Sequence, residues 1–229
     1  MRYTGKMKKT ILISGGSDGL GKAIAAQLTL NYRVVIISPS EDKLRAAAQE
    51  LGCEYKVCDV RDYQQIEKVV ADIGTLDCVV NNAGLWIEGA LDDADPEKIH
   101  EVLEVNTLGT MYLTRAVVPL MKQQKSGLII NVISQAGLYA KPNRSIYNAS
   151  KWAITGFTKA AQAELAPFGV RVTGLYPGKL NTELFAKSGI QKDMSNALDT
   201  VEVAKTVEFL LGFDNTVAVP EIGITHISN

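Results

Sequence analysis

The sequence has few residues of the kinds that build covalent or metallic scaffolds. Its 229 residues include only three cysteines, Cys53, Cys58 and Cys78, and two histidines. An odd number of cysteines without metal-ligand spacing argues against a disulfide framework and a zinc site. We therefore expect free thiols and no bound metal. A chain of this length buries enough apolar surface to fold without such cross-links.

Long apolar runs and a strong charge of one sign are also missing. No hydrophobic run approaches the length of a membrane span, and no charged leader precedes an apolar segment, so we expect a soluble cytoplasmic protein. The formal net charge is −1, which argues against binding to nucleic acid or to an anionic membrane. Residues 1–9, which include Lys8 and Lys9, are interpreted as a solvated N-terminal leader.

Short runs rich in valine and isoleucine alternate with stretches of helical periodicity. The runs predict strands buried on both faces at 10–14, 33–38, 54–58, 77–81, 127–133 and 170–176, and a last strand near 221–227. The periodic stretches predict helices at 20–31, 41–51, 62–73, 96–123, 146–166 and 201–211. This alternation predicts one α/β domain over 10–229, a Rossmann-type doubly wound, mostly parallel seven-stranded sheet with helices on both faces.

The first predicted strand runs directly into a glycine-rich turn, SGGSDGLG at 14–21. Gly15, Gly19 and Gly21 permit backbone angles barred to other residues and let a diphosphate approach the main chain. The following helix offers unpaired N–H groups and the positive end of its dipole. Because the turn joins the first strand to the first helix, we interpret it as a dinucleotide-binding site rather than a plain tight turn.

The stretch YNASK places Tyr147 and Lys151 one turn apart on a predicted helix. A nearby ammonium stabilises a phenolate, so such a pair can tune an acid whose pKa in water is about 10. The same pair can also be plain decoration on a solvated helix. The pair by itself does not decide between these interpretations.

The glycine spacing, NNAG at 81–84 and YNASK at 147–151 together resemble the short-chain dehydrogenase/reductase family, in its single-domain branch with a Tyr-x-x-x-Lys motif. The resemblance implies an NAD(P)-dependent oxidoreductase that transfers hydride between a nicotinamide cofactor and a secondary alcohol or carbonyl substrate. It implies four catalytic residues. They are Tyr147 as the acid/base, Lys151 as the cation that lowers its pKa and holds the ribose, Ser134 as the donor to the substrate oxygen, and Asn106 as the holder of a water in a proton path.

The resemblance also implies a cofactor site built from the turns that follow the strands. With Tyr147 and Lys151, its residues are Ser14, Gly15, Ser17, Asp18, Gly19, Leu20, Gly21, Ser38, Asp59, Val60, Asn82, Ala83, Gly84, Pro177, Gly178, Leu180 and Thr182. The end of the second strand carries no carboxylate, and Ser38 and Ser40 can hydrogen-bond a 2′-phosphate. NADP(H) is therefore favoured over NAD(H), although Asp18 would repel that phosphate.

No motif specifies the substrate. Four residues are expected to line its pocket under a short lid at 179–200: Trp86, Gln135, Tyr139 and Phe185. Cations at the same mouth, among them Arg144 and Lys187, are interpreted as solvated loop charges rather than as an anion site. The only partners expected are a small-molecule alcohol or carbonyl compound and further copies of the chain. The helices at 96–123 and 146–166 suit a homodimer or homotetramer.

Two other functions are kept as alternatives. A cofactor-sensing binding or regulatory module would hold the nucleotide without turnover, but its usual mark, loss of the tyrosine, lysine or serine, is missing from the sequence. An isomerase or dehydratase with transient oxidation would convert its substrate without a net change in nicotinamide absorbance. The chain shows no second domain for a nucleotide sugar, which the second alternative would favour.

Overall fold

Seven parallel strands form one sheet in the order β3-β2-β1-β4-β5-β6-β7. They are β1 (Thr10–Ser14), β2 (Arg33–Ser38), β3 (Glu54–Val57), β4 (Cys78–Asn81), β5 (Gly127–Val132), β6 (Val170–Pro177) and β7 (Glu221–Ile224). The computed structural model describes residues 8–228, so most of the predicted leader lies outside it. The order of the strands reverses between β1 and β4, where sheets of this kind bind ligands at their carboxyl ends.

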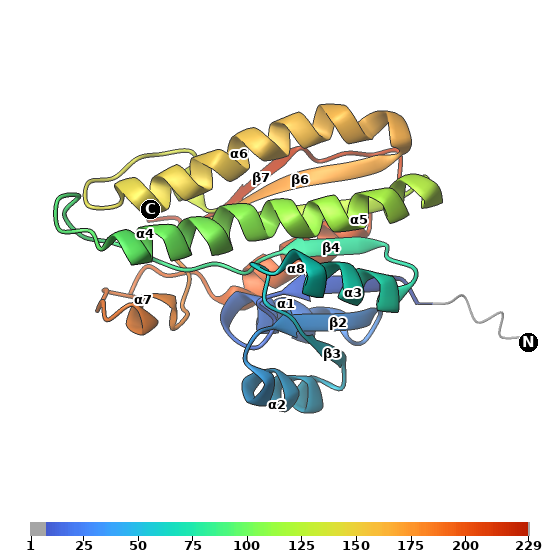
Figure 1. Ribbon diagram of the computed structural model, residues 1–229, viewed down its shortest axis with the longest axis horizontal. Helices are drawn as coiled ribbons and strands as arrows, with labels where there is room; N and C mark the ends of the chain where they lie inside the picture. The colour runs from blue at the N-terminus through green and yellow to red at the C-terminus, as the bar shows by residue number, and fades with distance from the viewer. Residues whose placement is uncertain (1–7, 229) are drawn as a thin grey trace, which may run out of the picture.

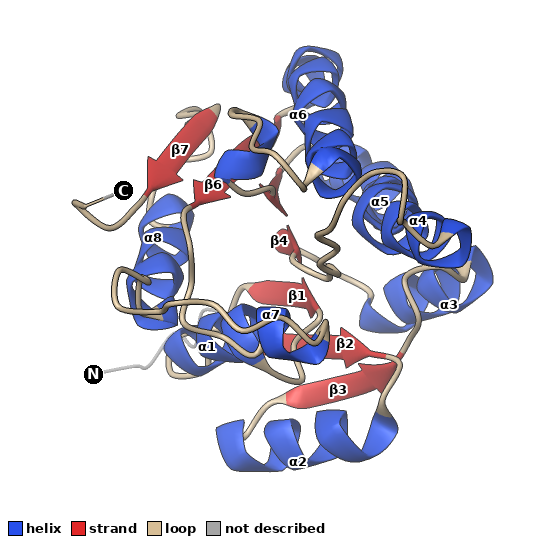
Figure 2. Ribbon diagram, turned by 90° about the vertical axis from the view of Figure 1, so that its left-hand side faces the viewer, coloured by secondary structure: helices blue, strands red, loops and turns tan. Residues whose placement is uncertain are grey.

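Helices cover both faces of the sheet (Figures 1 and 2). One face carries α1 (Gly19–Leu28), α2 (Glu41–Leu51) and α8 (Thr200–Leu211), and the other carries α3 (Tyr63–Ile73), α5 (Thr110–Gln124) and α6 (Ser145–Leu165). Shorter elements are α4 (Pro96–Leu103), η1 (Glu104–Gly109), η2 (Gln135–Gly137), η3 (Ala166–Phe168) and α7 (Leu184–Lys187). The predicted doubly wound α/β fold is confirmed, and its sheet is parallel throughout.

The apolar sequence of the central strands follows from burial on both sides. In β1, Ile11 and Ile13 point into the core beneath α1 and α8, whereas Leu12 points into the core beneath α3 and α5. Side chains of a strand alternate between the two faces of a sheet, so a strand covered on both sides is apolar on both faces in its middle. Such rigid strands hold the turns at their carboxyl ends in fixed positions.

The strand at the β3 edge differs from the prediction of burial on both faces. Tyr55 and Val57 are 37% and 43% exposed. Because β3 pairs only with β2, it lacks a neighbour on its outer edge, and most of its side chains reach solvent. The prediction for 54–58 was therefore right about the strand and wrong about its burial.

The predicted long helix at 96–123 is divided into three parts. Residues Glu104–Gly109 form η1, a π-helical segment between α4 and α5. A π-helical turn holds more residues than an α-helical turn and is often found at functional sites. Among residues 8–228, no helix combines the length and hydrophobicity needed to cross a membrane.

Candidate active site

A cavity of about 1110 Å³ opens at the carboxyl ends of the strands. Its wall includes the glycine-rich turn, the loops that follow β3, β4 and β5, and the segment after β6. All the predicted site residues lie on this wall except Ser14, Gly21 and Asn106. Those three contact the lining residues: Ser14 and Asn106 by hydrogen bonds, and Gly21 by close packing. The structure therefore brings together residues that lie far apart in the sequence.

The glycine-rich turn is closed to side chains on its inner side and open toward the cavity. A Cβ on Gly21 would stand 2.2 Å from the Gly15 carbonyl oxygen, whereas one on Gly19 would meet nothing nearer than Thr182, at 3.6 Å. Gly19 also has a φ of +50°, which favours glycine. The Ser14 hydroxyl accepts hydrogen bonds from the backbone N–H groups of Asn82 and Ala83, each 3.0 Å long. This rigid turn at the start of α1 fits a diphosphate.

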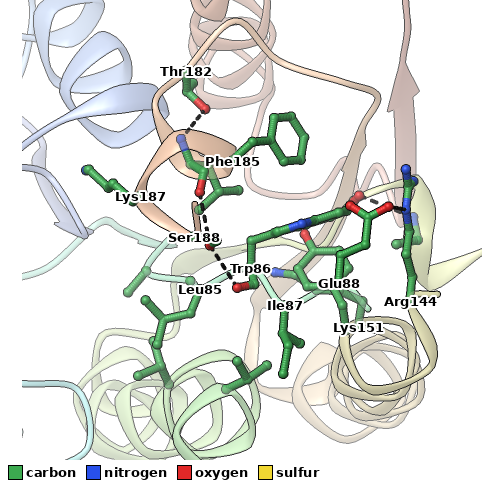
Figure 3. Close-up of a pocket in the computed structure, with 18 of the residues that line it drawn as sticks. Leu85, Trp86, Ile87, Glu88, Arg144, Lys151, Thr182, Phe185, Lys187 and Ser188 are labelled. Carbon is green, nitrogen blue, oxygen red and sulfur yellow. Dashed lines mark hydrogen bonds and ion pairs between the residues drawn. The ribbon is translucent and has the colours of Figure 1, made fainter. Parts of the chain in front are cut away.

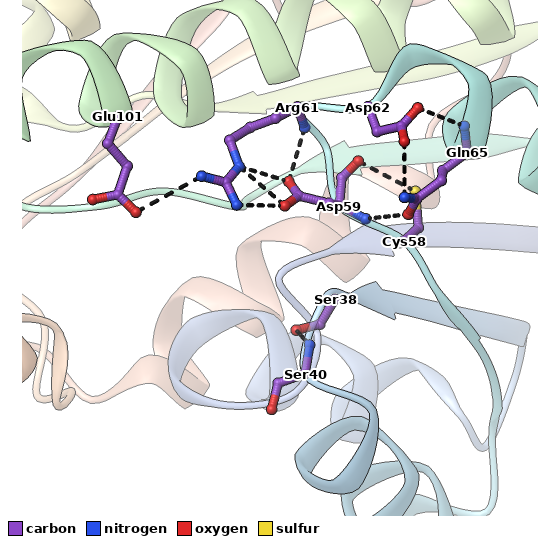
Figure 4. Close-up of polar contacts among 8 residues, drawn as sticks. All are labelled: Ser38, Ser40, Cys58, Asp59, Arg61, Asp62, Gln65 and Glu101. Atoms are coloured by element: carbon purple, nitrogen blue, oxygen red, sulfur yellow. Dashed lines mark hydrogen bonds and ion pairs between the residues drawn. The ribbon is translucent and has the colours of Figure 1, made fainter. Parts of the chain in front are cut away.

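At the far end of the cavity, two groups of polar residues face each other across the ends of β2 and β3 (Figure 4). On the β2 side, the Ser17 hydroxyl donates to the Ser38 hydroxyl over 3.2 Å. On the β3 side, both carboxylate oxygens of Asp59 accept hydrogen bonds from Arg61. This arginine holds the pKa of Asp59 below its usual value. Arg61 extends from Asp59 toward Glu101, away from the serines (Figure 4).

Lys151 and Asn106 converge on Gly84 in the middle of the cavity floor. A Cβ at Gly84 would lie 3.4 Å from Asn106 Oδ1 and 3.8 Å from Lys151 Nζ. The Lys151 ammonium donates one hydrogen bond, to the Val132 carbonyl at 3.2 Å, and its other two N–H donors have no partner among the described residues. Burial lowers the pKa of Lys151 to about 8. The free donors fit the ribose hydroxyls of a nucleotide cofactor.

The side chain of Asn106 braces the loop after β4. Its Oδ1 accepts from the Leu85 N–H at 2.7 Å, and its Nδ2 donates to the Leu85 carbonyl at 3.0 Å and to the Ser150 hydroxyl at 3.1 Å. Asparagine is a poor helix former, and Asn106 lies in the π-helical segment η1 with its side-chain hydrogen bonds made to a loop and to α6.

Tyr147 is almost fully buried at the side of the cavity. Its ring packs against Trp86, with centroids 4.3 Å apart. Burial raises the pKa of Tyr147 to about 12, against the lowering effects of a hydrogen bond with Ser134 and of the charge on Arg144. The sequence analysis expected Lys151 to lower the pKa of Tyr147. In the structure Lys151 Nζ lies 5.8 Å from the tyrosine ring centroid, and the two groups that lower this pKa are Ser134 and Arg144.

Ser134 follows β5 in a strained conformation. Its φ of 124° and ψ of 157° lie in a region populated almost only by glycine. Its hydroxyl also accepts from the Ala136 N–H at 3.2 Å. A strained backbone at this position supports a functional role, since such strain is found mainly at active sites and ligand-binding turns.

One carboxylate joins three loops around Trp86, and motif reasoning missed it. Glu88, from the loop after β4, pairs with Arg144 before α6 at 3.3 Å (Figure 3). It also pairs with Lys192 in the predicted lid at 2.6 Å. Arg144 was interpreted as a solvated charge, but its side chain is only 24% exposed. Nothing in the spacing of these three residues marks them as neighbours. Only the folded loops bring them together.

The lid also reaches the glycine-rich turn. Lys187 at the end of α7 forms an ion pair with Asp18, and it points away from the Trp86 side of the pocket (Figure 3). The hydroxyl of Ser188 donates to the Trp86 carbonyl at 3.0 Å. The predicted lid therefore contacts both the turn that fits a diphosphate and the pocket beside Tyr147.

Comparison with known proteins finds dehydrogenases and reductases. A trans-4-hydroxycyclohexanecarboxylate dehydrogenase of Sinomonas cyclohexanicum is 34% identical over 222 residues, which is 89% of this chain and 85% of the relative. Carbonyl reductase family member 4 of Xenopus tropicalis is 33% identical over 218 residues, 90% of this chain and 92% of the relative. The alcohol dehydrogenase from the archaeon Thermococcus sibiricus, complexed with 5-hydroxy-NADP, has a TM-score of 0.86 at 30% identity, over 98% of each chain.

The family model for short chain dehydrogenases matches residues 9–193, which include the glycine-rich turn, Ser134 and the Tyr147–Lys151 pair. The resemblance noted in the sequence is therefore confirmed, and so is the activity class, an NAD(P)-dependent oxidoreductase acting on alcohol or carbonyl groups. With its parallel sheet and the cavity at its switch point, this chain belongs to the short chain dehydrogenase family.

Proposed function

We propose that the chain interconverts a secondary alcohol and a carbonyl compound, with Tyr147 as the acid/base and Ser134 as the donor to the substrate oxygen. The observation that carries the proposal is the Tyr147 side chain, buried at the side of the cavity, with Ser134 lowering its pKa against the effect of burial. A bound nicotinamide supplies the hydride in reduction and accepts it in oxidation. With its pKa at about 12, Tyr147 is protonated at neutral pH and serves as the proton donor in reduction.

Lys151 and Asn106 complete the proposed proton path. Lys151 holds the cofactor ribose with its free N–H donors, and Asn106 holds a water beside it. The convergence of both side chains on Gly84 supports this assignment. After each reduction, the proton that Tyr147 gives to the substrate oxygen is restored through Lys151 from solvent.

Replacing Tyr147 with phenylalanine tests the mechanism. Tyr147→Phe keeps the ring that packs on Trp86 but removes the transferable proton. Carbonyl reduction, followed by nicotinamide absorbance, should fall by about 100-fold or more. Cofactor affinity, measured by fluorescence titration, should stay within about twofold, since the ring and its packing remain.

The matched control is Tyr55→Phe, since Tyr55 lies on β3 outside the cavity wall and is 37% exposed. This variant should keep the parent rate. Wild-type turnover by Tyr147→Phe would show that another group donates the proton.

We also propose a preference for NADP(H) over NAD(H). The hydrogen-bonded hydroxyls of Ser17 and Ser38, with Ser40 two residues further on, supply neutral partners for a 2′-phosphate, and no carboxylate follows β2 directly. Arg61 is paired with Asp59 and points toward Glu101, so its charge is directed away from these hydroxyls. Titration of the wild-type protein with NADPH and NADH checks the preference, and equal affinities would contradict it.

A homodimer or homotetramer in the cytoplasm completes the proposal. The outer surface where α4, η1 and α6 meet exposes three large apolar side chains: Leu103, Leu108 and Trp152. A second copy of the chain would bury them. A cytoplasmic location is supported by the three free cysteines, because reducing compartments keep thiols unpaired.

A further inference from the structure

Three charged side chains lie mostly buried in the wall of the cavity beside Trp86. Glu88, Arg144 and Lys192 have side chains that are 18%, 24% and 19% exposed. Burying charge is costly unless each group is paired, and here two cations share one carboxylate. The cluster therefore carries a single net positive charge that no described residue balances.

Part of the hydrogen-bonding capacity of this cluster is unused. Arg144 pairs with Glu88 through Nε, while its Nη1 and Nη2 groups make no hydrogen bond among residues 8–228. The indole Nε1 of Trp86 is buried and has no hydrogen-bond partner within the same residues. The indole N–H is covered by protein atoms, so the Nη groups of Arg144, which lines the cavity, are the free donors that a ligand can reach.

We propose that Arg144, positioned by Glu88, binds a carboxylate of the substrate, so that the substrate is an oxo acid or the corresponding hydroxy acid. The proposal rests on the proposed function and names the substrate class of the same site. The free edge of the guanidinium matches the planar carboxylate with two parallel N–H donors.

The charge of the cluster favours a carboxylate over a phosphate. A single net positive charge balances one carboxylate, whereas a phosphate ester brings a charge of about −1.5 to −2 next to Glu88. The walls around the cluster are aromatic, since Trp86 packs against Phe185 with centroids 4.8 Å apart. An apolar acid therefore fits the surroundings as well as the charge.

The position of Trp86 indicates where the rest of the substrate lies. The Trp86 ring centroid is 4.3 Å from that of Tyr147 and 5.1 Å from Arg144 Cζ. The indole thus contacts both the proton donor and the carboxylate site. The body of the substrate packs against the indole, with its carbonyl at Tyr147 and its carboxylate at Arg144.

Binding of benzoate and benzamide tests the carboxylate site without turnover. The two probes have nearly the same shape and differ in charge. Calorimetric titration of the protein saturated with NADP⁺ should give at least tenfold tighter binding of benzoate than of benzamide, because charge-assisted hydrogen bonds are stronger than neutral ones. Equal affinities, or no binding of benzoate, would overturn the proposal without any variant being made.

Two variants locate the site. Arg144→Gln should weaken benzoate binding by at least tenfold, while Lys141→Gln, which removes an exposed cation from the same cavity, should leave it within about twofold. An unchanged affinity in Arg144→Gln, or an equal loss in Lys141→Gln, would contradict the assignment. Benzoate binding without carbonyl turnover would leave this site standing and reject the hydride-transfer function, so the two proposals fail separately.

Discussion

Lys151 and Ser134 each destabilise the fold at the place where the site needs them. The ammonium of Lys151 is buried with one hydrogen bond, and Ser134 adopts backbone angles that cost about 1–3 kcal/mol in a residue other than glycine. Such costs persist only where the surrounding structure fixes the residue. Here the buried strand β5 and the helix α6 provide that rigidity.

The burial of Lys151 predicts a dependence of stability on pH. Its pKa falls from 10.5 to about 8 in the folded chain, so the unfolded chain binds more protons between those values. The free energy of unfolding of the wild type should therefore rise with pH from about 8 to 10.5. Lys151→Met removes the buried charge and should be more stable than the wild type by up to about 3 kcal/mol below pH 8, with the difference shrinking toward pH 10.5.

Urea unfolding at several pH values measures this difference. The control is Lys43→Met, which removes an exposed lysine from α2 and should show no such trend. A constant difference between Lys151→Met and the wild type over this pH range would mean that the ammonium is not desolvated in the folded protein.

Motif spacing was enough to predict that Tyr147, Lys151 and Ser134 share one site, because each follows or faces the end of a strand. Motif spacing did not predict that Arg144 belongs to the same site. This residue is three positions before Tyr147, and its effect on the tyrosine pKa depends on how the preceding loop places it over Trp86. A loop conformation of this kind follows from tertiary contacts, which a local pattern does not encode.

The π-helical segment η1 shows that sequence periodicity also fails to predict some features of a helix. Periodicity predicted one helix over 96–123, and most of that range is helical. The extra residue in the turn at Asn106 moves its amide into contact with Leu85 and Ser150, from another loop and another helix. The asparagine was visible as a poor helix former. The change in helical period was not visible, because it depends on those two distant partners.

The lid is held by a few polar contacts, and one of them is the ion pair of Lys192 with Glu88, a carboxylate that Arg144 also holds in place. Glu88→Gln would remove the charge that pairs with Lys192 and Arg144, so the lid should open more often. Amide hydrogen exchange in residues 184–192 should become about tenfold faster in this variant, as expected for a loss of about 1.4 kcal/mol of local stability.

Glu183→Gln is the control, since Glu183 is an exposed carboxylate at the start of the same segment. Its lid should exchange at the wild-type rate. If Glu88→Gln exchanged no faster than the control, the ion pairs with Glu88 would not hold the lid closed.

For the assembly, the exposed apolar surface at α4, η1 and α6 gives a direct prediction. Trp152 on α6 is 51% exposed, and we expect a second copy to cover it. Trp152→Glu would place a charge in that contact and should shift the protein toward the monomer in sedimentation velocity at micromolar concentration. Leu30→Glu, at an exposed position after α1, should leave the sedimentation coefficient unchanged. A monomeric wild-type protein would contradict the proposed oligomer.

The class of the sheet was predictable from the sequence, but the burial of every strand was not. Alternating strands and helices predicted a doubly wound parallel sheet, because few topologies satisfy right-handed crossovers. Local patterns do not show which strand lies at an edge. The exposure of β3, with Tyr55 and Val57 facing solvent, therefore appeared only in the structure.

The contacts of the lid with both halves of the cavity have a kinetic consequence. Lys187 holds Asp18 at the glycine-rich turn, and Ser188 holds the loop of Trp86, so one cover closes both sites. A diphosphate held by the turn would offer Lys187 a second anion beside Asp18 and would change how the lid lies over the neighbouring pocket. We therefore expect the cofactor to bind before the substrate, and product-inhibition kinetics would check this order.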